Sequence, residues 1–169
     1  RAENRAAFVS YLTAGFPSEA AFLESARGVL GVADVLEVGL PYSDPLGDGP
    51  TIQRSSEAAL RQGMTTGKTF ELIARLREDS DRAIALMTYY NPIYCYRRGE
   101  GGFLEDLARA GADGLILPDL PPEEAGTLIP AGRTLGLDTV FLVAPTSTRS
   151  RLEAVTSACR GFVYAVSVT

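Results

Sequence analysis

The sequence contains no histidine and only two cysteines among its 169 residues. Without histidine, this segment cannot build a Ser-His-Asp or Cys-His nucleophilic system or a histidine-based metal site. Cys95 and Cys159 lie far apart and outside any Cys-x-x-Cys pattern, so neither a disulfide framework nor a zinc site is indicated. We therefore expect no metal site and two buried free thiols. Acid-base chemistry must rely on carboxylates, tyrosine, lysine or cysteine.

Positive charge and long apolar runs are also scarce. Lysine and arginine number 16 against 21 acidic residues, a net charge of −5, whereas nucleic-acid binders need clustered cations. No apolar run approaches the roughly 20 residues that a membrane helix requires, and residues 1–5 precede no apolar signal core. We expect a cytoplasmic chain that binds neither nucleic acid nor membrane. The hydrophobic share of 46% and the length suit a single folded domain.

Apolar, β-branched runs alternate with segments of helical periodicity along the chain. Most of the apolar runs do not alternate with polar residues, a pattern typical of a parallel sheet whose two faces are covered by helices. The sequence therefore favours a doubly wound sheet or a β/α barrel. The six candidate strands are residues 7–13, 35–40, 84–90, 114–117, 139–144 and 161–168. The candidate helices are residues 18–30, 53–60, 70–77, 103–110, 123–135 and 150–158.

Two helix-like segments lie between the second and third candidate strands, so we expect an extra helix there. A β/α barrel needs eight strands and about 250 residues, whereas this sequence offers six strands. We expect one partial β/α-barrel domain over residues 1–169, with strands seven and eight missing and further residues beyond Thr169. A doubly wound binder of small molecules remains the alternative, and strand count and closure distinguish the two folds.

Glu37 lies inside an apolar strand, where an unpaired carboxylate is costly to bury. Burial disfavours the charged form, so we expect a raised pKa that suits a general acid-base. A structural glutamate held in a hydrogen-bonded pair is the alternative. Asp44 and Asp48 follow in a loop dense in proline and glycine, where a second carboxylate would allow divided acid and base roles. Both aspartates are equally compatible with simple turn formation.

Several strand residues can line a ligand pocket, although each is also a normal core residue. Tyr164 lies in the sixth candidate strand, where a phenol that points into a barrel would contact substrate. The others are Tyr11, Met87, Ile116 and Leu142. The loops that leave the strands are rich in proline and aromatic residues and can alternatively form a protein interface.

Four segments resemble tryptophan synthase alpha subunits in order and spacing: YLTAGFP at 11–17, LEVGLPYSDPLGDGPTIQ at 36–53, MTYYNP at 87–92 and PDLP at 118–121. The resemblance covers essentially the whole chain, and the second segment is the most specific. It implies a TIM (β/α)8 barrel, here truncated after about six strands. It also implies a lyase of tryptophan biosynthesis, which splits indole-3-glycerol phosphate into indole and glyceraldehyde 3-phosphate by retro-aldol cleavage.

The resemblance assigns roles to particular positions. Glu37 matches the family's general acid-base, and Asp48 matches the carboxylate that accepts a hydrogen bond from the indole N–H. Tyr164 matches an active-site tyrosine near Glu37, while Tyr11 stands where many relatives have Phe. The positions that match the contact with the beta subunit are Asp44, Pro45, Asn91 and Pro121. That subunit holds pyridoxal phosphate and forms an alpha2-beta2 heterotetramer, and the alpha subunit has no cofactor of its own.

The alternative to the lyase function is a non-catalytic barrel that binds and regulates a partner enzyme. The presence of both Glu37 and Asp48 favours the enzyme. The family's mobile loop after strand six and its phosphate grip would lie beyond Thr169. We therefore expect little or no activity from these 169 residues alone, because remote phosphate contacts supply binding energy that positions the reacting carbons.

Overall fold

Six parallel strands form one curved sheet in the computed structural model, which describes residues 5–167. The strands are β1 (Val9–Thr13), β2 (Val35–Gly39), β3 (Ala83–Met87), β4 (Gly114–Leu117), β5 (Asp138–Val143) and β6 (Tyr164–Ala165). The helices are α1 (Glu19–Leu30), α2 (Pro50–Arg61), α3 (Thr66–Arg77), α4 (Tyr90–Tyr94), α5 (Gly99–Arg109), α6 (Leu128–Thr134) and α7 (Arg149–Ala158). None of the helices within residues 5–167 is long and apolar enough to cross a membrane.

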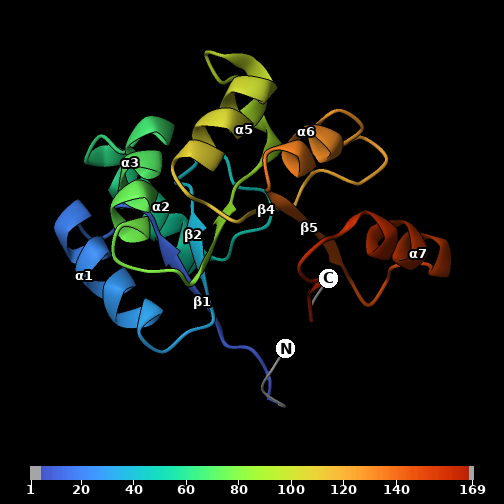
Figure 1. Ribbon diagram of the computed structural model, residues 1–169, viewed down its shortest axis with the longest axis horizontal. Coiled ribbons are helices and arrows are strands. Elements are labelled where there is room, and N and C mark those ends of the chain that lie inside the picture. Colours follow the sequence, from blue (N-terminus) through green and yellow to red (C-terminus); the bar gives the residue numbers. More distant parts are fainter. Residues whose placement is uncertain (1–4, 168–169) are drawn as a thin grey trace.

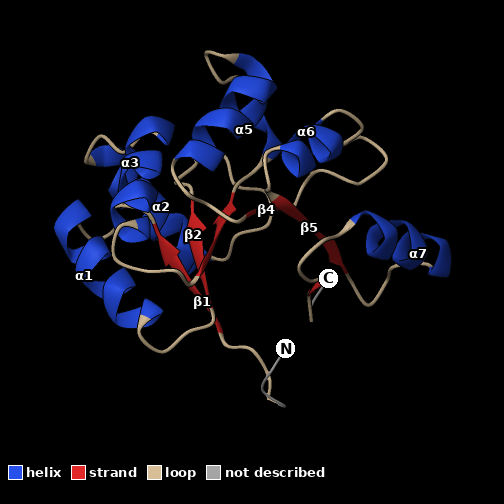
Figure 2. Ribbon diagram, in the orientation of Figure 1, coloured by secondary structure: helices blue, strands red, loops and turns tan. Residues whose placement is uncertain are grey.

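The strand order β1-β2-β3-β4-β5-β6 follows the chain. Each strand therefore pairs with its successor, and Figures 1 and 2 show the helices along the outer side of the sheet. A doubly wound sheet reverses its strand order and carries helices on both faces. The described residues instead form part of a β/α barrel, as the sequence predicted.

Alternate residues of the strands face two separate cores. Outward-facing residues such as Leu36, Ile84 and Leu115 are buried in the main core against the helices. Inward-facing residues form a second cluster, whose fully buried members are Ala85, Ile116 and Val140. Both faces of the central strands β2 to β5 are therefore largely covered, which explains why these strands read as continuous apolar runs.

Helix ends agree with local sequence signals. Ser18 caps α1 by accepting a hydrogen bond from the amide of Ala21 at 3.2 Å. Gly111 and Gly136 follow α5 and α6 with φ of 88° and 78°, a left-handed conformation that glycine adopts without strain. Helices α2 and α3 both lie between β2 and β3, so the prediction of an extra helix is confirmed.

Three predicted elements and two thiols need correction. The strand predicted over 84–90 ends at Met87, and the chain turns into α4, which the sequence analysis missed. The helix predicted over 123–135 begins only at Leu128, after a run of turns. The strand predicted over 161–168 shortens to Tyr164–Ala165, and position 168 lies outside the described residues. Cys95 is exposed and Cys159 only half-buried, so the expectation of two buried thiols is wrong.

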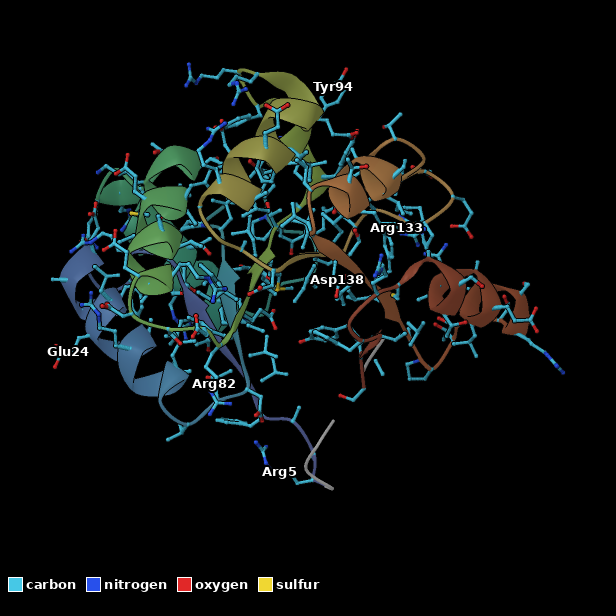
Figure 3. All side chains as sticks on the ribbon, in the orientation of Figure 1. Arg5, Glu24, Arg82, Tyr94, Arg133 and Asp138 are labelled. Atoms are coloured by element: carbon cyan, nitrogen blue, oxygen red, sulfur yellow. The ribbon has the colours of Figure 1, made fainter. Side chains whose placement is uncertain are left out.

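At the amino-terminal edge of the sheet, Asp34 joins segments that are distant in sequence. Its carboxylate accepts hydrogen bonds from Arg5 at 2.7 Å and from the amide of Phe8 at 2.8 Å. Arg82 approaches the same carboxylate at 3.4 Å, and Figure 3 shows Arg5 and Arg82 on the same side of the chain. These contacts hold the Asp34 pKa well below its usual range and tie the segment before β1 to the sheet.

Candidate active site

A cavity of about 580 Å³ opens on the inner side of the sheet, where the strands end at their carboxyl termini. In β/α folds this edge carries the functional loops. Its lining comes from β1, β2, β3, β5, β6, α2 and the segments that follow β2, β3, β4 and β6: Tyr11, Glu37, Gly47, Asp48, Gly49, Ile52, Met87, Tyr89, Pro118, Leu142, Tyr164 and Val166.

Glu37 contributes a carboxyl group to the floor of this cavity. It lies at the centre of β2, paired in register with Tyr11 on β1 and Ala85 on β3, and is 4% exposed. Within the described residues, no hydrogen bond or ion pair holds its carboxylate, so the alternative of a structural pair is not supported. Burial, followed by the charge of Asp48, raises the Glu37 pKa to about 7. The predicted rise in pKa is confirmed.

Asp48 supplies a second carboxylate from the loop between β2 and α2. Its backbone carbonyl accepts a hydrogen bond from Gln53 Nε2 at 2.8 Å, which anchors the loop to the start of α2. Burial raises the pKa of the carboxyl group, and a hydrogen bond from the Tyr89 phenol lowers it. The charge of Asp48 contributes to the raised pKa of Glu37, so the two carboxyl groups influence one another's protonation, as in sites with divided acid and base roles.

Tyr11 covers the cavity wall on the side of β1. Burial raises the pKa of its phenol to about 12, so the hydroxyl stays protonated at neutral pH. The ring lies directly over Gly39, where an added Cβ atom would meet Tyr11 Oη at 2.0 Å. The Thr13 hydroxyl lies 3.4 Å from Tyr11 Oη and 2.7 Å from the Ser55 hydroxyl. A glycine in β2 is therefore required for this ring position.

Of the apolar or aromatic residues that the sequence analysis proposed for the pocket, all but one line the cavity. The exception is Ile116, which is fully buried with Ala85 and Val140 in the inner core. It is paired in register with Met87, which does line the cavity. Its contact with substrate therefore stays a prediction.

The sequence analysis missed several lining residues. Tyr89 lies just beyond the end of β3 and belongs to one of the segments that carry the family resemblance, so its position was a usable signal. Ile52 belongs to α2, and only the three-dimensional path of that helix directs it into the cavity. The other missed residues are Gly47, Gly49, Pro118 and Val166.

The four residues predicted at a partner interface lie on the loops after β2 and β4 and on α4, which follows β3. Asp44 and Asn91 are exposed, whereas Pro45 and Pro121 are half-buried. Asn91 Nδ2 donates a hydrogen bond to the Tyr42 hydroxyl at 2.8 Å, which joins α4 to the loop after β2. Large apolar side chains are exposed on the same loops and on α4, including Leu46 at 85% and Tyr94 at 71%. Figure 3 shows Tyr94 directed away from the chain.

Within the described part of the chain, no group of three or more acidic or cysteine side chains could hold a metal ion. The site therefore consists of two carboxylates with shifted pKa values, three phenols, and apolar walls from Ile52, Met87 and Leu142. This arrangement can donate and accept protons on a small, largely apolar molecule.

Comparison with known proteins points to one family. Residues 1–169 match the family model described as tryptophan synthase alpha chain. The tryptophan synthase alpha chain of Deinococcus radiodurans is 52% identical over 168 residues, and the match covers 99% of this chain and 62% of that protein. The chain thus spans less than two thirds of the length of this relative.

Solved structures give the same result. A crystal structure of tryptophan synthase from M. tuberculosis superposes with a TM-score of 0.91 at 45% identity, and the match covers 97% of this chain and 65% of that one. A structure described as the tryptophan synthase a2b2 complex of Pyrococcus furiosus superposes with a TM-score of 0.89 at 38% identity, covering 94% and 65% of the two chains.

Proposed function

The chain belongs to the tryptophan synthase alpha chain family, and we propose that it carries the lyase site of that subunit. The reaction is the retro-aldol cleavage of indole-3-glycerol phosphate to indole and glyceraldehyde 3-phosphate, a step of tryptophan biosynthesis. The observation that carries this proposal is the unpaired, buried Glu37 carboxyl group beside Asp48 in one cavity.

Glu37 is the proposed general acid-base. With a pKa of about 7 it is partly protonated at neutral pH, so it can give a proton to indole C3. The resulting carboxylate then takes the proton of the glycerol hydroxyl next to the ring, and the carbon-carbon bond breaks. The hydroxyl carbon becomes the aldehyde of glyceraldehyde 3-phosphate, and the bonding electrons return to the ring to form indole.

Asp48 is the proposed partner of the indole nitrogen. Protonation at C3 places positive charge on the ring nitrogen, and a carboxylate that accepts the N–H hydrogen bond stabilises that charge as it develops. Tyr11, Met87, Leu142 and Tyr164 form the proposed walls around the ring. These groups act without a metal or organic cofactor in this chain.

We further propose that the loops after β2, β3 and β4 contact a beta subunit in an alpha2-beta2 complex in the cytoplasm. Asp44, Pro45, Asn91 and Pro121 lie at one edge of the sheet beside exposed apolar side chains, and such a combination is typical of protein interfaces. In the family, pyridoxal phosphate belongs to the beta subunit, which consumes the indole.

The decisive experiment measures indole release from indole-3-glycerol phosphate by the full-length protein, with and without a beta subunit. Glu37→Gln is expected to abolish release, because it removes the proton donor and acceptor but keeps the side-chain size. Glu24→Gln is the matched control, because Glu24 is exposed on α1 and, in Figure 3, projects away from the sheet.

Wild-type activity that rises with the beta subunit and disappears in Glu37→Gln would establish the lyase and the role of Glu37 together. A wild-type protein that binds the beta subunit but releases no indole would instead be a non-catalytic barrel that regulates its partner.

A further inference from the structure

Tyr89 lies at the edge of the cavity, in a segment whose backbone is anchored by hydrogen bonds. It is 5% exposed and lies just beyond β3, after Thr88. The amide of Thr88 donates to the Ile116 carbonyl at 3.1 Å, which extends the sheet pairing to the preceding residue. The amide of Tyr90 donates to both carboxylate oxygens of Asp119 at 3.0 Å. The backbone is therefore held on both sides of Tyr89, whereas Asp48 lies on a loop.

The Tyr89 phenol connects this anchored segment to the loop that carries Asp48. Its oxygen accepts a hydrogen bond from the amide of Gly47 at 3.0 Å, and its hydroxyl group lies near enough to the adjacent Asp48 carboxyl group to lower the pKa of that group. A phenol has a single proton, so the amide contact leaves that proton for the carboxylate. The ring also packs against Tyr42, from the same loop, with ring centroids 5.6 Å apart.

From this geometry we propose that Tyr89 is a positioning residue that holds the Asp48 carboxylate, ionised and correctly oriented, toward the substrate. The inference rests on the proposed lyase function and adds a residue to its machinery. A hydrogen bond to a charged carboxylate is stronger than one between neutral groups and fixes its direction. A ring that merely filled space would not require the hydroxyl group.

The electrostatics of the cavity agree with this role. Burial raises the pKa of Asp48, and the bond from Tyr89 opposes that rise. The charge on Asp48 in turn contributes to the raised pKa of Glu37. Loss of the phenol hydroxyl is therefore expected to raise the pKa of Asp48, so that its protonation interferes with activity at a higher pH.

The test is Tyr89→Phe in the full-length protein with its beta subunit, because phenylalanine keeps the ring that packs on Tyr42. We expect kcat/KM to fall roughly 10-fold or more, as for a lost hydrogen bond to a charged group. The loss should appear mainly in kcat, and the acid limb of the pH profile should move to higher pH. Tyr90→Phe is the matched control, because its hydroxyl bonds Glu100 at 3.0 Å, away from the cavity.

A double variant separates action through Asp48 from any other effect. If Tyr89 works by positioning Asp48, then Tyr89→Phe should cause little further loss in an Asp48→Asn background. An undiminished loss in that background would overturn the proposal. A Tyr89→Phe protein with the wild-type rate and pH profile would also overturn the positioning proposal, but it would leave the proposed lyase function intact.

A second measurement makes the inference independent of turnover. Carbon-13 NMR titration of the Asp48 carboxyl group should give a higher pKa in Tyr89→Phe than in the wild-type protein. If the wild type releases no indole, the proposed lyase function fails and this titration alone decides the positioning role. An Asp48 pKa that does not change would refute it.

Discussion

Removal of the Glu37 charge is expected to stabilise the fold at neutral and alkaline pH. The pKa of Glu37 rises on folding from 4.5 to about 7, chiefly because the side chain is buried. Below pH 4.5 both the folded and unfolded states hold the proton. Between the two pKa values only the folded state holds it, so the free energy of unfolding falls as the pH rises. Above pH 7 the folded state bears the full cost of a buried charge.

The size of this effect follows from the two pKa values. A difference of one in pKa corresponds to about 1.36 kcal/mol, so ionised Glu37 costs the folded state about 3 kcal/mol above pH 7. Glutamine keeps the shape of the side chain and carries no charge. Glu37→Gln should therefore gain about 3 kcal/mol of stability over the wild type as the pH rises through this window.

Urea unfolding of the full-length protein at about pH 5 and about pH 8 measures this difference directly. Most of the gain should appear between these two conditions, and Glu24→Gln, a change at an exposed position on α1, is the control variant. A stability difference between wild type and Glu37→Gln that is the same at both pH values would refute the argument. It would mean that the Glu37 carboxyl group is solvated or paired in the folded protein.

Two further predictions concern packing and acid stability. Gly39→Ala should destabilise the fold by about 1–3 kcal/mol and raise KM, because the new Cβ atom would displace the Tyr11 ring. An unchanged melting temperature and an unchanged KM would contradict this prediction, because they would show that the ring can move freely. Asp34→Asn should lower the melting temperature at neutral pH and have little effect in strong acid. The bound partners lower the Asp34 pKa on folding, so its stabilisation is present above pH 3.8 and is lost as the pH falls through the folded pKa. If Asp34→Asn lowered the melting temperature by the same amount at neutral pH and in strong acid, the stabilisation could not come from the charge of Asp34.

Local sequence signals located most of the framework. Apolar runs with no polar alternation predicted six parallel strands, because residues buried on both faces of a sheet must be apolar at every position. Glu37 stood out for the same reason, since it interrupts such a run. Its burial and raised pKa agree with that interpretation. Proline and glycine also marked the loop that carries Asp44 and Asp48, because their backbone preferences act within a few residues.

The errors arose where distant residues decide the local structure. The third strand stops at Met87 and α4 begins at Tyr90, whose amide donates a hydrogen bond to the Asp119 carboxylate, 29 residues away. Ile116 is buried in the inner core beside Met87, its register partner, so its contact with substrate stays a prediction.

The sequence by itself determined the succession of strands and helices, the edge of the sheet that carries the polar loops, and the presence of two carboxylates close together in the chain. Only the tertiary structure decided which side chains share the cavity and how they affect one another. Tyr89 meets Asp48 across 41 positions of the chain because β3 lies beside β2 in the sheet. The pKa of Glu37 likewise depends on how deeply the packed barrel excludes water, and that property belongs to the assembled fold rather than to any segment.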